Sequence, residues 1–159
     1  MKTAIYPGSF DPMTYGHVDI ASRAASIFDK IYFVVASNYE KNCLFSLDER
    51  IEIAKEVFKD NPKIEVVKGE GLIAKQAQKL NAKAIIRGLR MVTDYEYEVQ
   101  FSQVCSYLAP DIEIVFLFAK QEFSFVSSTR VKEIFSLGGD VCNLVPTPVL
   151  KAMEEKFKK

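Results

Sequence analysis

The segment from Tyr6 to His17 contains the only histidine of the chain, within a turn rich in glycine and proline. Gly8 allows the backbone to turn sharply and a phosphate to come close. Gly16 and His17 are expected to open a helix, whose first amide groups point toward any anion placed there. The imidazole can donate a hydrogen bond to a phosphoryl oxygen. An ordinary turn with an incidental histidine is the alternative.

Two arginines surround a glycine in the segment Ile86–Arg90. Arg87 and Arg90 suit the binding of phosphate, because a guanidinium group presents paired donors to phosphate oxygens. A surface turn with solvated arginines would have the same sequence. Lys41 follows an earlier apolar run and is a further candidate cation, although a loop lysine is usually just solvated.

A third segment places three hydroxyl residues, Ser127, Ser128 and Thr129, at an expected helix start. Their hydroxyl groups can cap the helix, or the segment can form an anion site from free backbone amides. Earlier in the chain, Asp94, Glu96 and Glu98 are expected to form the acidic face of a helix, where one carboxylate can bind a ribose hydroxyl.

The amino-acid composition argues against several classes of function. Lys plus Arg equals 21 and Asp plus Glu equals 21, whereas nucleic-acid-binding proteins usually carry a basic surplus. The three cysteines fit no disulfide framework and no zinc spacing, so we expect reduced thiols. With one histidine, a serine or cysteine nucleophile has no second histidine as its base. The sequence also lacks the Gly-x-Gly-x-x-Gly and P-loop patterns.

These features favour a site that positions phosphates and neutralises their charge, as phosphoryl and nucleotidyl transfer require. No apolar run approaches the roughly 18 residues of a membrane helix, and the first residues show no signal-peptide pattern. We therefore expect a cytoplasmic protein with neither a membrane nor a nucleic-acid partner.

The elements that must position these residues follow from hydrophobic patterning. Short apolar runs predict buried parallel strands, at Thr3–Tyr6, Ile31–Ala36, Ile64–Val67, Ala84–Ile86 and Ile112–Phe118. Amphipathic stretches predict helices between and after them, at Gly16–Phe28, Leu47–Phe58, Leu72–Leu80, Asp94–Leu108, Ser127–Leu137 and from about Pro148. This alternation predicts one α/β domain over residues 1–159, a Rossmann-like, doubly wound, five-stranded parallel sheet with helices on both faces. Ligands of such sheets bind at the carboxyl ends of the strands, which is where the phosphate-binding candidates lie.

Taken together, the motifs resemble a known family. Tyr6–Phe10 with Thr14-Tyr15-Gly16-His17 is similar to the His-x-Gly-His motif of the nucleotidyltransferase superfamily, with Thr14 in place of the first histidine. Ser127-Ser128-Thr129 resembles its Ile-Ser-Ser-Thr motif. With Ile86–Arg90, Asp94–Glu98 and Phe123–Val126, the chain resembles the bacterial phosphopantetheine adenylyltransferases from Ala4 to about Leu150.

The resemblance implies that ATP and 4'-phosphopantetheine react to give dephospho-coenzyme A and pyrophosphate, with Mg²⁺ and without a covalent enzyme intermediate. It assigns transition-state stabilisation to His17. For ATP binding it implies Ser9, Phe10, His17, Gly88, Leu89, Arg90, Glu98, Phe123, Ser124, Phe125, Val126, Ser127, Ser128 and Thr129. For the acceptor it implies Ser9, Lys41, Ile73 and Arg87. It names no metal-ligating residue, leaves open which protein groups, if any, hold the Mg²⁺, and implies a homohexamer.

Three positions depart from the family pattern. Ser9 stands where many relatives have Thr, Phe123 where many have Trp, and Cys105 where we expect an Asn that lines the acceptor site. Two alternatives stay open. Another nucleotidyltransferase of the superfamily, acting on nicotinate mononucleotide or glycerol phosphate, should differ along Arg87–Glu98. A non-catalytic nucleotide-binding module can share the same fold.

Overall fold

The computed structural model describes residues 1–37 and 42–158. It contains a five-stranded sheet in the order β3-β2-β1-β4-β5, and every recorded strand pair is parallel. The strands are β1 (Thr3–Gly8), β2 (Lys30–Val35), β3 (Ile64–Lys68), β4 (Ala84–Leu89) and β5 (Glu113–Phe118). The predicted doubly wound α/β fold is therefore confirmed.

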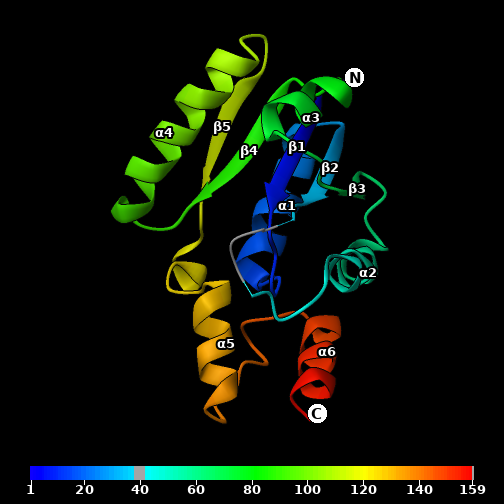
Figure 1. The fold of residues 1–159 in the computed structure, drawn as a ribbon, viewed down its shortest axis with the longest axis vertical. Helices are drawn as coiled ribbons and strands as arrows, with labels where there is room; N and C mark the ends of the chain where they lie inside the picture. Colours follow the sequence, from blue (N-terminus) through cyan, green and yellow to red (C-terminus); the bar gives the residue numbers. More distant parts are fainter. Residues whose placement is uncertain (38–41, 159) are drawn as a thin grey trace.

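Helices connect the strands and cover both faces of the sheet (Figure 1). They are α1 (Tyr15–Ile27), α2 (Leu47–Phe58), α3 (Ile73–Lys79), α4 (Val92–Leu108), α5 (Ser128–Ser136) and α6 (Thr147–Phe157). A short 3₁₀ helix, η1 (Gln121–Phe123), precedes α5 and was not predicted. In Figure 1, α5 and α6 lie together beyond one end of the sheet, below α1.

Side chains alternate between two apolar cores, because successive residues of a strand point to opposite faces. On β1, Ala4 and Tyr6 join the larger core with residues of α1, α2, α5 and α6. Ile5, between them, joins a smaller core with residues of α3 and α4. The chain changes face after β3, so β1 and β4 lie side by side while their connections run in opposite directions. The crevice at this point is where doubly wound sheets bind ligands.

The expectation that all five strands are buried on both faces was wrong for the two edge strands. In β3 only Ile64 is buried, and the departure is larger in β5. This strand forms an edge of the sheet, its residues are partly or fully exposed, and Phe118 is 73% exposed. Helix α4, which follows β4 and precedes β5, is also apolar on its outer side, where Val104 and Tyr107 are exposed. A run of apolar residues therefore did not distinguish a buried strand from an edge strand.

Candidate active site

A cavity of about 410 Å³ opens at the carboxyl ends of β1 and β4. Its wall comes from the connections that follow β1, β4 and β5, from Cys43 of the connection that follows β2, and from the start of α5. The predicted site residues that line it are Ser9, Phe10, His17, Arg87, Gly88, Arg90, Glu98, Phe123, Val126, Ser127, Ser128 and Thr129. The three segments identified from the sequence thus meet at one site, which is large enough for a small-molecule ligand.

Four predicted residues lie outside this wall: Ile73, Leu89, Ser124 and Phe125. Leu89 is buried, whereas Phe125 is 63% exposed. Ile73 packs against the core on the α3 and α4 face of the sheet. Lys41 lies outside the described residues. Cys105, where the family pattern suggested an acceptor contact, is buried in the same core as Ile73, and burial raises the pKa of its thiol.

His17 is held by the first turn of α1. The backbone N–H of Thr14 donates to His17 Nδ1 at 3.0 Å, and Thr14 Oγ1 accepts from the backbone N–H of His17 at 3.4 Å. Thr14 is the N-cap of α1 and is almost completely buried. The residue that replaces the first histidine of the superfamily motif therefore orients the second one.

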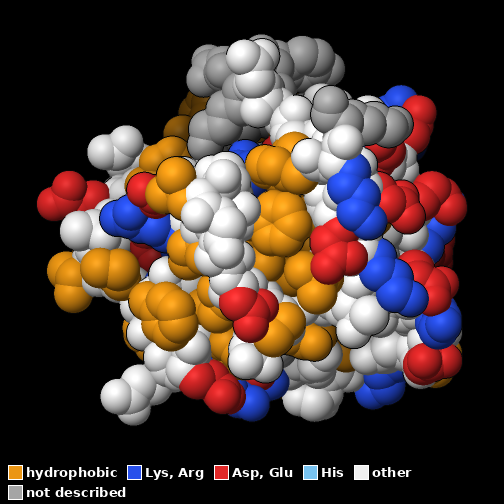
Figure 2. Space-filling view, turned by 90° about the horizontal axis from the view of Figure 1, so that it is seen from below, with side chains coloured by type: hydrophobic (Ala, Val, Ile, Leu, Met, Phe, Trp, Pro, Cys, Tyr) orange, Lys and Arg blue, Asp and Glu red, His pale blue; other side chains and the backbone are white. Residues whose placement is uncertain are grey.

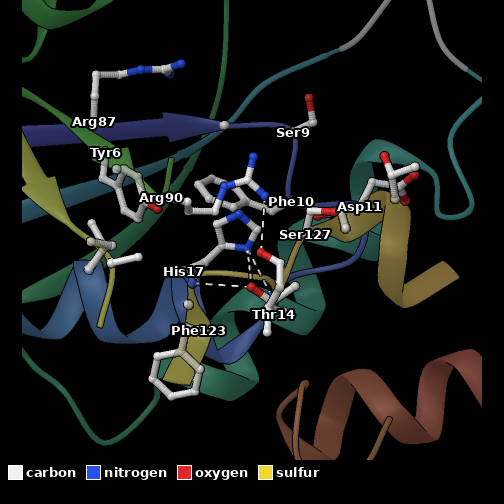
Figure 3. Close-up of a pocket in the computed structure, with 18 of the residues that line it drawn as sticks. Tyr6, Ser9, Phe10, Asp11, Thr14, His17, Arg87, Arg90, Phe123 and Ser127 are labelled. Carbon is white, nitrogen blue, oxygen red and sulfur yellow. Dashed lines mark hydrogen bonds between the residues drawn. The ribbon is translucent and has the colours of Figure 1, made fainter. Parts of the chain in front are cut away.

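This contact determines the tautomer of the imidazole. A nitrogen that accepts from a backbone N–H carries no proton, so the proton of the neutral ring is assigned to Nε2. Figure 3 shows Nδ1 turned toward Thr14 and the opposite edge of the ring directed toward Arg90 and Phe10. Burial, together with the charge of Arg90, lowers the His17 pKa to about 4. The ring is thus a neutral donor at neutral pH.

Phe10 supports the other side of the imidazole. Its ring lies edge-on to that of His17, with centroids 5.0 Å apart, and stacks on Phe33 of β2 at 4.0 Å. Its backbone is left-handed, with φ of 51°, a strained conformation for an aromatic residue. A Cβ on Gly8 would lie 2.8 Å from the Phe10 ring. Gly8 is therefore needed for this packing, in addition to the close phosphate approach predicted from the sequence.

Arg87 and Glu98 form a buried ion pair. The guanidinium Nε and Nη2 atoms donate to the two carboxylate oxygens at 2.8 and 2.7 Å, and the guanidinium lies 4.4 Å from the centre of the Phe101 ring. Arg87 Nη1 also donates to the Pro7 carbonyl at 3.4 Å. The resemblance assigned these two residues to different substrates, but in the free protein they act as one unit.

Arg90 is held more loosely. Its Nη1 donates to the Val126 carbonyl at 3.1 Å, which joins the connection after β4 to the one before α5. Its nearest carboxylate is that of Asp94, at 3.4 Å. Asp94 also accepts from the backbone N–H groups of Arg90 and Met91, so it caps α4, and the predicted acidic helix face is divided between a cap and an ion pair.

The hydroxyl residues at the start of α5 line the cavity, and Ser127 also caps the helix. Ser127 Oγ accepts from the backbone N–H of Arg130 at 3.1 Å, and Ser128 Oγ donates to the Pro12 carbonyl at 2.7 Å. Helix capping and anion binding by this segment are therefore compatible, because the cap leaves the first backbone amides of α5 at the cavity.

Sequence reasoning missed two charged residues of the wall, Asp11 and Lys132. Asp11 is buried and accepts from the backbone N–H groups of Leu44 and Phe45 at 2.7 and 2.9 Å. Lys132 of α5 lies 3.2 Å from the same carboxylate. The contact joins residues 121 positions apart, so local spacing gave no signal for it.

The part of the chain that the structure describes holds no cluster of three or more His, Cys, Asp or Glu residues suited to a metal ion. Of the carboxylates at the cavity, Asp11 accepts from two backbone amides and a lysine, and Glu98 is paired with Arg87. Within the same residues, no helix is long and apolar enough to cross a bilayer.

Comparison with known proteins agrees with this geometry. Residues 5–134 match the cytidylyltransferase-like family. A protein of Caldanaerobacter subterraneus subsp. tengcongensis named phosphopantetheine adenylyltransferase is 50% identical over all of this chain and 99% of its own. A protein of the same name from Geotalea daltonii is 48% identical with the same coverage. The chain belongs to the cytidylyltransferase-like family and, within it, to the phosphopantetheine adenylyltransferases.

Proposed function

We propose that this chain transfers the adenylyl group of ATP to 4'-phosphopantetheine by direct attack in the cavity between β1 and β4. An oxygen of the acceptor phosphate forms a bond with the α-phosphorus of ATP, and the bond from that phosphorus to the bridging oxygen breaks. The products are dephospho-coenzyme A and pyrophosphate. The attacking oxygen is already anionic, so the step needs no protein base.

The observation that carries the proposal is the orientation of His17. Its Nδ1 is engaged by Thr14, and its protonated Nε2 belongs to the edge of the ring directed into a cavity that Arg90 also lines (Figure 3). An imidazole with a pKa of about 4 is too weak a base to hold a transferred proton at neutral pH. It suits a fixed donor to a non-bridging oxygen of the α-phosphate, where charge accumulates in the transition state.

The remaining roles follow from charge and position. Arg90 and the start of α5 face the β- and γ-phosphates, and Ser9 and Phe10 lie beside the α-phosphate. Arg87, held by Glu98, and Lys41 bind the acceptor phosphate. Mg²⁺ enters as part of the MgATP substrate, because the two cavity carboxylates are already engaged by protein donors.

A pyrophosphate-release assay with ATP and a panel of phosphorylated acceptors tests the proposal. 4'-Phosphopantetheine is expected to react far faster than nicotinate mononucleotide or glycerol phosphate. All three carry a phosphate that matches the cations, but only 4'-phosphopantetheine has the long, less polar arm that the family resemblance implies. Equal or reversed preference would refute the acceptor while leaving adenylyl transfer intact. No pyrophosphate with any acceptor would favour a non-catalytic nucleotide-binding module.

We also propose that the chain assembles into a homo-oligomer, a hexamer by resemblance, and acts in the cytoplasm. The support for assembly is the exposed apolar surface of α4 and of the end of β5, where Tyr95, Val104, Tyr107 and Phe118 are exposed. A helix with apolar residues around its circumference is usually covered on all sides. A second copy of this chain is the proposed occupant.

Replacing Val104 and Tyr107 together with glutamate is expected to dissociate the assembly, because charges buried in an apolar interface cost several kcal/mol. Light scattering coupled to gel filtration should report about 18 kDa for the variant, the mass of one chain, and a multiple of it for the wild type. Replacing Leu137, an exposed leucine after α5, with glutamate is the control. A monomeric wild-type protein would contradict the proposal.

Apolar side chains also occupy the middle of the face that includes the α5 and α6 end of the molecule, with charged residues gathered toward one side (Figure 2). Phe135 and Phe157 join these two helices through ring centroids 5.0 Å apart.

A further inference from the structure

Arg50 of α2 is a buried arginine outside the wall of the cavity. It is 4% exposed, and its recorded hydrogen bonds all go to backbone carbonyls. Its Nε donates to Phe45 at 3.2 Å, and its Nη1 donates to Ser9 at 2.7 Å and to Ala36 at 2.8 Å. A buried guanidinium loses its hydration and needs well-placed acceptors in exchange. These acceptors come from the connections that follow β1 and β2.

The first of these connections carries the groups beside the proposed α-phosphate. Ser9 precedes Phe10, whose backbone is left-handed and whose ring supports His17. A turn in a strained conformation persists only where its surroundings fix it. Arg50 fixes it by holding the carbonyl of Ser9, and the amides of Leu44 and Phe45 hold the same turn through the Asp11 carboxylate.

The second connection runs from β2 to α2 and includes Lys41, which lies outside the described residues. Ala36 precedes this position and Phe45 follows it, and Arg50 binds the carbonyls of both. The same guanidinium nitrogen joins Ala36 to Ser9. One side chain therefore fixes the two connections relative to each other, beside the proposed acceptor site.

We propose that Arg50 is a positioning residue for adenylyl transfer: its guanidinium holds the Ser9–Phe10 turn and both flanks of the β2–α2 connection in the arrangement that the acceptor requires. The inference rests on the proposed function, because it presumes that the acceptor binds between these connections. Lysine is a poor substitute, since its single ammonium lacks the planar fork that reaches three carbonyls at once.

The test compares Arg50→Met, Arg50→Lys and the control Lys55→Met, which removes an exposed cation of the same helix that pairs with Glu52. Steady-state constants for both substrates are measured per folded molecule, well below each melting temperature. Arg50→Met is expected to lower kcat about 10–100-fold, because displacements of about 1 Å at a reacting centre cost up to 10²-fold. KM for 4'-phosphopantetheine should rise more than KM for ATP, because Arg50 has no recorded contact with Arg90 or α5, the groups assigned to the β- and γ-phosphates.

A role confined to stability would lower the melting temperature of Arg50→Met and leave its kinetic constants within about threefold of wild type, and that result would overturn the inference. If Arg50→Met does not fold, Arg50→Lys decides the matter. It should lose at least fivefold in kcat/KM for the acceptor, and a loss below twofold would overturn the inference. Failure of the proposed function is distinct, because wild type and Lys55→Met would then also release no pyrophosphate with 4'-phosphopantetheine.

Discussion

Replacing His17 with alanine is expected to lower kcat by about 10²–10³-fold, the usual cost of removing one preorganised donor from a developing oxyanion. The proposed direct attack has no covalent step, so the protein would contribute by stabilising charge on the α-phosphate. Thr14 occupies the position of the partner histidine and caps α1, which leaves one imidazole for this task. The affinity for ATP should fall much less than kcat, because the donor acts mainly when the phosphorus becomes five-coordinate.

The variant His17→Asn distinguishes a catalytic role of His17 from a structural one. The asparagine oxygen can take the place of Nδ1 and accept from the Thr14 N–H, but no donor then reaches the position of Nε2. Its kcat should match that of His17→Ala, while its melting temperature should stay closer to wild type. Turnover within about threefold of wild type in either folded variant would mean that the catalytic centre lies elsewhere.

The lowered pKa of His17 also predicts how the stability of the folded protein depends on pH. Between the ordinary value of 6.5 and the folded value of about 4, the unfolded chain binds a proton that the folded protein does not. The stabilising effect of the neutral ring is therefore complete above about pH 6.5 and lost as the pH falls toward 4. With allowance for screening by water in the cavity, the free energy of unfolding should fall by about 2 kcal/mol over this pH range. Urea unfolding of wild type should show this extra loss relative to His17→Asn.

The positions of the phosphate-binding segments could be predicted from the sequence because they depend on local patterns. The turn rich in glycine and proline, the arginine–glycine segment and the hydroxyl cluster each come after a predicted strand. Ser9, Arg90 and Ser127 were therefore expected at the carboxyl edge of a parallel sheet. The structure brings these three to one cavity. The ends of the strands differed by a few residues, since β1 continues to Gly8 and β4 to Leu89.

Contacts between distant segments could not be predicted in this way. The pairing of Glu98 with Arg87 depends on how α4 packs against β4, and the carbonyl contacts of Arg50 depend on how two loops meet. Phe10 looked like a phosphate neighbour, and only the fold shows that its ring occupies the space above Gly8. Local spacing identifies candidate ligands, whereas their partners follow from the tertiary structure.

Arg90→Ala is expected to weaken ATP binding by about one to two orders of magnitude. A charge-assisted hydrogen bond to phosphate contributes about 1.5–3 kcal/mol, and each 1.4 kcal/mol is tenfold in affinity. Calorimetry with a non-hydrolysable ATP analogue measures the effect directly. The affinity for 4'-phosphopantetheine should change little, because the proposed acceptor contacts are Arg87 and Lys41 and do not include Arg90.

Arg130→Ala is the matched control, since Arg130 belongs to the same segment as the Ser127 cap but is exposed and pairs with Glu133. Its loss should leave ATP affinity within about twofold, as for most exposed ion pairs. Unchanged affinity in a folded Arg90→Ala variant would contradict the assignment.

Arg90 is the stronger candidate of the two cavity arginines because the charge of Arg87 is already neutralised by Glu98 through two short hydrogen bonds. The Asp94 carboxylate lies 3.4 Å from Arg90 and is shared with two backbone amides, so Arg90 keeps more of its positive charge available for the triphosphate.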